Sequence, residues 1–284
     1  MRSIKKIHKA EYRPIDDLET YSPLPTRSLQ QIDPFLFLNH HGPQHYGPDN
    51  NGLPFGPHPH RGMETVTFIL EGDIAHLDSD GHKSVITAGG VQWMTAGRGL
   101  LHSEVSSEPF KKEGGDLEIL QLWVNLPAKL KMTEPKYIGL QKDDIPHINE
   151  NDGNVTIDLI AGSREGTSGA FDTLTDLFLS TIRFKSTGTL SFSIPTDHNI
   201  FCYVIRGEFT INDSPVEALH LVEFNNDDES VTIESNTDGI ILFGHAEPFN
   251  EPVVAGGPFV MNSREEIQQA YQDFYDGKFG TWNE

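Results

Sequence analysis

Short apolar stretches, rich in β-branched and aromatic residues, recur through the first half of the chain and are separated by glycine-containing turns. Residues of these types are typical of β-strands, and glycine supplies the positive φ that tight turns between strands require. Many short strands at regular spacing are typical of an antiparallel barrel or sandwich. The pattern therefore predicts an all-β fold, with strands at residues 64–70, 74–78, 84–87, 91–95, 100–105 and 117–126.

The second half of the chain repeats this pattern. Strands are predicted at residues 178–184, 189–194 and 200–205, and the turn at Gly207 follows its strand as the turn at Gly72 follows the strand at 64–70. Superposing Gly207 on Gly72 indicates an internal duplication. Because a proline- and lysine-containing connection lies at residues 127–146, we expect two domains, at residues 1–140 and 141–284.

Two segments depart from the strand pattern. Residues 39–57 are rich in His, Gly, Pro and Asn, and we expect an irregular loop there, close to the site that follows it. Near the C-terminus, Ser263 and Glu266 form a capping box ahead of apolar residues at helical spacing, and Gly277 provides a stop. The sequence therefore predicts a short C-terminal helix at residues 263–277, as part of the second domain.

Charge and composition narrow the class of partner. The net charge of −21 divides into −2 for residues 1–142 and −19 for residues 143–284, and such a surface repels phosphate backbones, so we expect no direct nucleic-acid binding. No apolar run follows the basic N-terminus, and the longest apolar stretches are too short for a bilayer, so we expect neither a secretory signal nor a membrane anchor. Cys202 is the only cysteine, which fits a reducing cytoplasm, where we expect the protein.

Potential metal ligands occur in two closely spaced pairs, His58 with His60 and His102 with Glu104. Residues i and i+2 of a β-strand point to the same face, so folding the intervening segment back on itself brings together three imidazoles and one carboxylate. This set suits one divalent transition metal, and the spacing alone leaves Zn, Fe(II), Mn, Co, Ni and Cu open. Four protein ligands on an octahedral ion would leave two positions for substrate and O₂ or water. The alternative interpretation is that these are partly buried polar residues of an ordinary sheet.

Three further residues are candidates for a supporting role at the site. Glu64 stands four residues after His60, and we expect it on the same strand face as the histidines. His41 is expected to line the mouth of the site from the loop at residues 39–57, and Arg61 to lie beside the pocket.

Other histidines receive a structural interpretation. His76 and His82 flank a hairpin turn that also contains Asp78, and we interpret them as residues of a solvated turn. Counting back from Gly207 places Ser193 and Pro195 where His58 and His60 stand in the first half. Since neither is a metal ligand, we expect the second domain to be a metal-free copy.

The residues H-P-H-R-G-x-E-T-V and Q-W-M-T-A-G-R-G-L-L-H-S-E resemble the pirin family, a branch of the cupin superfamily. The resemblance is dense across residues 58–104 and extends from Asp33 to about Leu126. It implies a bicupin, two antiparallel β-barrel or jelly-roll domains that face each other, with a metal in the N-terminal barrel alone. The family's ligands correspond to His58, His60, His102 and Glu104, its members bind Fe(II), and Glu64 is implied to lie outside the ligand set.

The resemblance also implies two classes of function. Several bacterial members resemble quercetin 2,3-dioxygenases, which open flavonols such as quercetin with O₂ and release CO; on this hypothesis Glu104 is the catalytic residue and accepts the proton of the substrate 3-hydroxyl. Other members are metal-dependent transcriptional cofactors, so the alternative is a regulatory metal-binding protein that binds a protein partner through a barrel surface or the acidic second half. Loss of flavonol absorbance in the presence of the Fe(II)-loaded protein separates the two.

Overall fold

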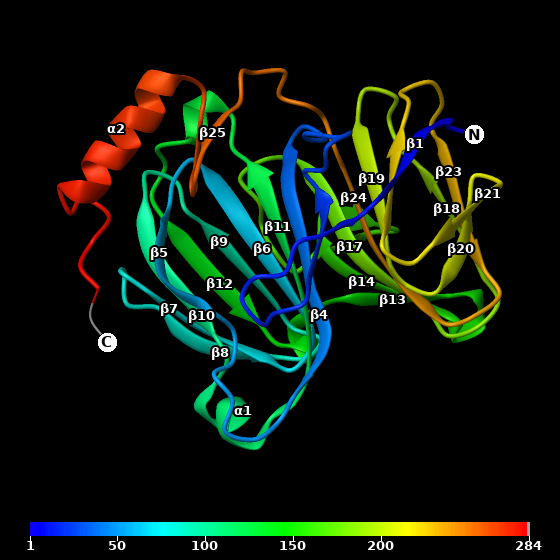
Figure 1. Cartoon of the computed structure of the whole chain (residues 1–284). Coiled ribbons are helices and arrows are strands. Elements are labelled where there is room, and N and C mark those ends of the chain that lie inside the picture. Colours follow the sequence, from blue (N-terminus) through cyan, green and yellow to red (C-terminus); the bar gives the residue numbers. More distant parts are fainter. Residues whose placement is uncertain (283–284) are drawn as a thin grey trace. The chain divides into compact units, whose positions relative to one another are not determined.

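Residues 1–282 are described by the computed structural model, and they form two compact units built mainly of β-strands (Figure 1). The histidine unit contains residues 12–21, residues 35–142 and the chain from residue 249 onward, and so includes both ligand pairs. The companion unit contains residues 1–11, 22–34 and 143–248. The all-β fold class predicted from the sequence is confirmed.

Two antiparallel sheets form the histidine unit. The seven-stranded sheet has the order β12 (Lys136–Leu140), β9 (Val91–Thr95), β6 (Met63–Glu71), β11 (Gly115–Asn125), β4 (Phe35–Tyr46), β3 (Thr20–Leu24) and β2 (Glu11–Tyr12). The four-stranded sheet has the order β5 (Phe55–His60), β10 (Leu100–Val105), β7 (Asp73–Asp78) and β8 (Lys83–Thr87). Ile69 and Ile119 of the first sheet pack with Ile74 and Ile86 of the second, so the sheets share one interior.

The companion unit has the same construction. Its seven-stranded sheet has the order β1 (Ile4–Lys9), β22 (His220–Phe224), β19 (Asn199–Arg206), β24 (Gly239–Ala246), β17 (Leu177–Phe184), β14 (Val155–Ala161) and β13 (His147–Glu150). Its four-stranded sheet has the order β18 (Gly188–Ser193), β23 (Ser230–Ser235), β20 (Glu208–Ile211) and β21 (Ser214–Glu217). The consecutive strands β17 to β24 take the places that β4 to β11 take in the histidine unit. The predicted duplication is therefore confirmed at the level of strand order.

Two α-helices and several short elements complete the described chain. The predicted C-terminal helix is confirmed as α2 (Arg264–Tyr275), with Ser263 as its N-cap and the capping box to Glu266 formed. A second helix, α1 (Glu108–Glu113), was not predicted because six residues are too few to show helical periodicity. The short elements are the 3₁₀ turns Ala128–Leu130, Lys142–Asp144 and Asn151–Gly153, and the strand pairs β15 (Ser163–Arg164) with β16 (Thr167–Ser168) and β25 (Val254–Gly256) with β26 (Phe259–Met261). Within residues 1–282, no helix combines the length and apolar character needed to cross a membrane.

The two ends of the chain lie in units other than those the sequence suggested. Strand β1 pairs with β22 of the companion unit, whereas α2 belongs to the histidine unit, where Phe259 forms a bridge with Arg61. Local sequence patterns do not report partners so distant along the chain. The division into contiguous domains 1–140 and 141–284 thus remains a prediction, and the compact units differ from it at both ends.

The irregular loop predicted at residues 39–57 is wrong over much of its length. Strand β4 continues to Tyr46 between β11 and β3, and β5 already begins at Phe55. Pairing on both edges of β4 overrides the low strand propensity of its His, Gly and Pro residues, and a register shift against β11 accommodates them.

Candidate metal centre

Two neighbouring antiparallel strands bring the three histidines together. His102 of β10 lies opposite His58 of β5, and His60 lies two residues further along β5, on the same face. One ring nitrogen from each of these histidines lies within 4.8 Å of those of the other two. Over the described part of the chain this is the one grouping of three potential ligands. The structure therefore brings the three histidines together, and their binding of a metal stays a prediction.

Burial keeps two of these rings neutral. His60 and His102 are 3% and 0% exposed, whereas His58 is half-buried. Burial, with a contribution from the neighbouring His58, lowers the pKa of His60 to about 3. Burial and the surrounding histidines likewise hold the pKa of His102 well below its usual range. At neutral pH both rings therefore carry the free lone pair that a metal ligand requires.

The hydrogen bonds of the rings show which nitrogens are free. Nδ1 of His58 donates to the carbonyl of Gly56 at 2.7 Å, and Nδ1 of His60 donates to the carbonyl of Pro258 at 3.1 Å. Because a carbonyl only accepts, these bonds place the proton on Nδ1 and leave Nε2 bare. Nε2 of His60 and both ring nitrogens of His102 are buried, with no hydrogen-bond partner among residues 1–282. An unpaired buried nitrogen is unfavourable, and one divalent transition metal would satisfy Nε2 of His60 and one of the two ring nitrogens of His102, so the residues fit the implied metal.

Glu104 lies on β10, as His102 does; it extends into the interior of the unit and is 1% exposed. Its carboxylate accepts hydrogen bonds from three side chains of the facing sheet: Thr67 at 3.0 Å, Gln92, and Gln121 at 2.6 Å. These bonds fix its position across the interior, and it is not part of the three-histidine grouping. Glu104 as a fourth ligand therefore stays a prediction.

Glu64 lies on the opposite face of its sheet from the Glu104 contacts. Residues directly opposite each other in an antiparallel pair share a face, and Thr67 lies opposite Gln92 whereas Glu64 lies opposite Thr95. Positions 64 and 67 are an odd number apart, so Glu64 points away from the interior, where its carboxyl accepts from Thr95 at 2.6 Å and burial raises its pKa. The expectation that Glu64 shares a face with the histidines is wrong. The chain turns at Gly62, so His60 and Glu64 lie on different strands, β5 and β6, and the alternation of side chains along one strand does not relate them.

His41 and Arg61 also lie differently from the expectation. His41 is buried, shares a 2.9 Å hydrogen bond with Thr20, and has its pKa lowered to about 3 by burial and by His40. It therefore does not line an open mouth. The Arg61 guanidinium bonds to the carbonyl of Arg98 at 2.6 Å and to Asp273 of α2 at 2.8 Å. Arg61 thus reaches from the histidine motif to the C-terminal helix.

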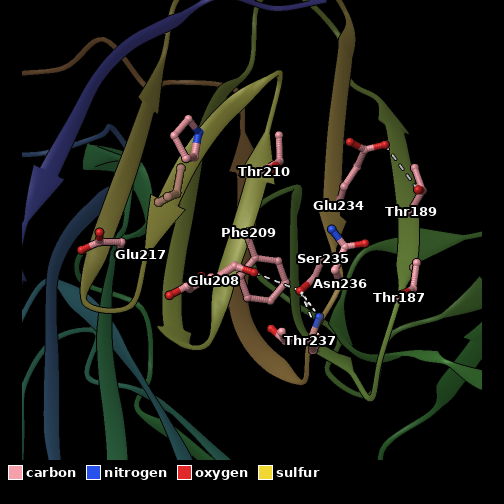
Figure 2. A pocket seen from close by; sticks show the side chains of 13 residues that line it. Thr187, Thr189, Glu208, Phe209, Thr210, Glu217, Glu234, Ser235, Asn236 and Thr237 are labelled. Atoms are coloured by element: carbon pink, nitrogen blue, oxygen red, sulfur yellow. Dashed lines mark hydrogen bonds between the residues drawn. The ribbon is translucent and has the colours of Figure 1, made fainter.

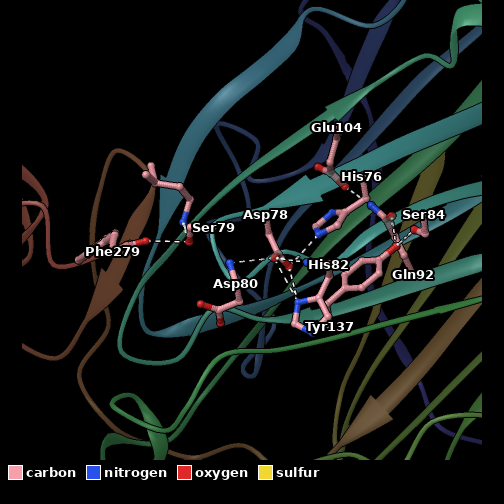
Figure 3. A network of polar contacts seen from close by, with 11 residues as sticks. His76, Asp78, Ser79, Asp80, His82, Ser84, Gln92, Glu104, Tyr137 and Phe279 are labelled. Carbon is pink, nitrogen blue, oxygen red and sulfur yellow. Dashed lines mark hydrogen bonds and ion pairs between the residues drawn. The ribbon is translucent and has the colours of Figure 1, made fainter. Parts of the chain in front are cut away.

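A buried polar network adjoins the site (Figure 3). The interpretation of His76 and Asp78 as solvated turn residues is wrong: they are 1% and 3% exposed, and Nε2 of His76 lies 3.1 Å from the Asp78 carboxylate. Burial opposes ionisation of Asp78, but bonds from His76 and the backbone of His82 outweigh it and lower its pKa. The His76 ring stacks on Tyr137, with centroids 3.8 Å apart, and the Tyr137 hydroxyl donates to Gln92 at 3.0 Å. The network therefore reaches Glu104 through Gln92.

The glutamines and the threonine around Glu104 were not selected from the sequence. Their signal is present, however, because Thr67, Gln92 and Gln121 are polar residues within strands whose other positions are mostly apolar. All are buried or half-buried, and a polar residue on the inner face of such a strand needs a partner there. This pattern predicts a polar interior even where the partner is unknown.

The companion unit has an apolar interior at the equivalent strands. Phe192 of β18 and Ile233 of β23 belong to its hydrophobic core, whereas Ser193 is exposed. Ser193 therefore points outward, and the predicted correspondence with the inward-facing His58 is wrong. Thirteen described residues line a cleft of about 380 Å³ on this unit, including the exposed Glu208, Glu217 and Glu234, and none of these thirteen is a histidine or cysteine (Figure 2). This cleft therefore lacks the imidazole ligands that the three-histidine cluster would supply to a transition metal.

Paired sheets repeated twice in one chain, with three histidines inside one of the repeats, define a two-domain cupin protein. The sequence profile of the pirin family matches residues 17–124, and that of the pirin C-terminal cupin domain matches residues 179–280. The chain belongs to the pirin family.

Individual relatives cover most of the chain. A Pseudomonas aeruginosa protein named "Putative quercetin 2,3-dioxygenase" is 40% identical over 262 residues, covering 90% of this chain and 92% of its own. Pirin-1 of Arabidopsis thaliana is 41% identical over 232 residues, covering 80% of this chain and 78% of its own. The crystal structure of quercetin 2,3-dioxygenase from Acinetobacter baumannii superposes with a TM-score of 0.91 and 33% identity, over 99% of both chains.

Proposed function

We propose that this pirin-family protein is a metal-dependent dioxygenase that opens the ring of a flavonol such as quercetin with O₂ and releases CO. The observation that carries the proposal is the combination of three convergent histidines with bare nitrogens and a buried carboxylate fixed nearby. Relatives named as quercetin 2,3-dioxygenases at 33% and 40% identity support the same reaction class.

His58, His60 and His102 would hold one divalent ion, with Fe(II) as the first choice and Mn, Co, Ni, Cu or Zn as chemically acceptable alternatives. When bound, the ion would lower the pKa of a coordinated substrate hydroxyl and hold it beside O₂. The half-buried His58 gives the cluster its most accessible side, since the other two rings are buried. Glu104 is proposed as a ligand or a near neighbour of the ion.

Glu104 would act as the general base. A carboxylate that accepts three hydrogen bonds from neutral donors is held in one orientation, and its remaining lone pairs are available to a substrate hydroxyl. The amides of Gln92 and Gln121 donate to opposite oxygens of the carboxylate, so rotation about its terminal bond is restrained. The proton of the flavonol 3-hydroxyl would pass to Glu104, which leaves the electron-rich enolate that O₂ attacks.

Aromatic side chains beside the histidines suit a flat substrate. The Trp123 ring meets His60 edge to face, with centroids 5.2 Å apart, and stacks on Phe37 with centroids 4.6 Å apart. Both Trp123 and Phe37 are half-buried, so part of each ring remains available for contact. Stacking of a polycyclic flavonol on such rings is favourable because it buries apolar surface in a defined orientation.

Aerobic incubation of the Fe(II)-loaded protein with quercetin tests the proposal. We expect loss of the flavonol absorbance and release of one CO per substrate. His102→Ala should lose metal retention and turnover together, whereas Glu104→Gln should lose turnover while keeping most of the metal. Full activity of metal-loaded His102→Ala would contradict the assignment.

The rival function is a metal-dependent regulatory protein that binds a protein partner. The charge of −19 over residues 143–284 favours a basic protein surface over nucleic acid as that partner. Metal binding without turnover of quercetin and related flavonols, over several metals, would favour this function.

A further inference from the structure

The C-terminal segment returns to the histidine motif of the first half. Pro258 accepts the Nδ1 proton of His60, Phe259 forms a parallel bridge with Arg61, and the backbone N–H of Val260 donates to the carbonyl of Arg61 at 3.0 Å. Residues about 200 positions apart in sequence are thus neighbours within one unit. We call this segment, Pro258 to Phe279, the C-terminal strap.

The strap supplies the contact that orients His60. Both His58 and His60 donate from Nδ1 to a backbone carbonyl, but the partner of His58 is Gly56 of its own strand, whereas the partner of His60 is Pro258 of the strap. Without Pro258, either ring nitrogen of His60 could carry the proton, and only one of the two tautomers leaves Nε2 free. The partner of a ligand's second nitrogen fixes the ring and its basicity in this way at metal sites.

Glycines of the histidine motifs make room for the strap. Gly62 has φ of 81°, and a Cβ on it would lie 2.0 Å from the carbonyl oxygen of Val260. A Cβ on Gly99 would lie 2.6 Å from the ring of Phe279. The buried ammonium of Lys131 donates to the carbonyls of both Gly62 and Val260, at 2.8 and 3.0 Å. These motif glycines therefore serve close packing against the strap as well as local turns.

An ion pair holds the helical part of the strap. Arg61, next to His60 in sequence, bonds to Asp273 of α2 at 2.8 Å, and its guanidinium lies over the Phe279 ring at 4.6 Å. The two side chains of the ion pair are only 5% and 12% exposed, so solvent screens the pair weakly. Asp273 thus connects α2 to the residue beside a proposed metal ligand.

We propose that the C-terminal strap is a working part of the metal centre: Pro258 fixes the tautomer of His60, and the Arg61–Asp273 pair keeps Pro258 in place. The inference rests on the proposed metal binding of the three histidines and is independent of which reaction follows.

The key variant is Asp273→Asn, which keeps the shape of the side chain and removes its charge. The matched control is Asp276→Asn, three residues further along. Its carboxylate lies 3.4 Å from Lys278, a cation that also pairs with Asp273 at 2.7 Å, so the control removes a carboxylate charge from the same helix end without touching the Arg61–Asp273 pair. Gly62→Ala is a second test variant that obstructs Val260 directly. Co(II) affinity and release rate are measured by chelator competition, the metal-free His60 tautomer by ¹⁵N NMR, and the folded fraction of each metal-free variant by circular dichroism.

We expect Asp273→Asn and Gly62→Ala to bind Co(II) at least about tenfold more weakly and to release it faster, with Asp276→Asn unchanged. We also expect a single Nδ1–H tautomer of His60 in the metal-free wild type and a mixture in the two test variants. Should Gly62→Ala fail to fold, Asp273→Asn decides the question.

Wild-type affinity and an unchanged tautomer in folded Asp273→Asn would overturn the inference, as would losses explained fully by the unfolded fraction. A wild type that binds no Co(II), Fe(II) or Ni(II) would instead defeat the proposed metal function, and a tautomer shift in Asp273→Asn would still support the positioning role.

Discussion

Replacing Gln121 by leucine removes a hydrogen bond that holds Glu104 while leaving the three histidines unchanged. The change removes the amide donor to Glu104, at 2.6 Å, and the acceptor for the Trp123 indole N–H, at 3.2 Å. A hydrogen bond to a charged group contributes about 1.5–3 kcal/mol, and a neutral one about 1 kcal/mol. The added apolar surface of leucine offsets roughly 1 kcal/mol of this loss. We therefore expect Gln121→Leu to lower the free energy of unfolding by about 2 kcal/mol.

Thermal unfolding of the metal-free protein is the direct assay, and a loss of this size lowers Tm by about 4–8 °C in a protein of this class. Gln268→Leu is the matched control, because Gln268 is exposed on α2, and we expect it to change stability by less than about 0.5 kcal/mol. Turnover of the Fe(II)-loaded variant should fall about tenfold, as is typical when a supporting contact is lost. A wild-type Tm for Gln121→Leu would refute the view that this amide holds the buried carboxylate.

Three further predictions concern the rest of the molecule. Burial, then His198 and Arg2, lowers the pKa of His245 to about 3, so below about pH 6.5 the unfolded chain binds a proton at this residue that the folded chain does not bind. This difference makes the folded state less stable as the pH falls. His245→Gln should therefore reduce the loss of stability between pH 6.5 and 4 by about 1.4 kcal/mol per pH unit, measured by urea unfolding. Ser263→Ala should cost about 1 kcal/mol of stability through loss of the α2 cap, measured in the same way. Burial raises the pKa of Cys202, so a thiol reagent should modify it in denaturant and leave the native protein unmodified; rapid native modification would contradict its placement in the core.

Local pattern was sufficient for the strands of the central repeats and for the histidine pairs. The strands from Met63 to Val105 alternate with glycine turns, and both hairpin geometry and i, i+2 spacing are local properties of the chain. The grouping of His58, His60 and His102 therefore follows from the amino-acid sequence alone. The capping box at Ser263 is local as well, and it predicted α2 correctly.

Contacts between segments that are distant in sequence could not be predicted from the local pattern. The face of Glu64 depended on how the chain turns at Gly62, and the partners of Arg61 lie in α2 and at Arg98. His76 and Asp78 resemble turn residues in sequence, but the His76 ring stacks on Tyr137, about sixty residues away, and Asp78 pairs with His76. In each case a tertiary partner, rather than the residue's own neighbours, decided its environment.

The return of the C-terminal strap to His60 also orders events during synthesis. The strands that carry the three histidines leave the ribosome early, but Pro258 and Asp273 follow more than 150 residues after His102. Contacts of such long sequence separation form late in folding, so the final geometry of His60 is available only to chains that have been synthesised through α2. If the strap orients His60 as proposed, chains that stop before it would carry all three histidines yet bind metal more weakly, and metal occupancy would report synthesis through α2.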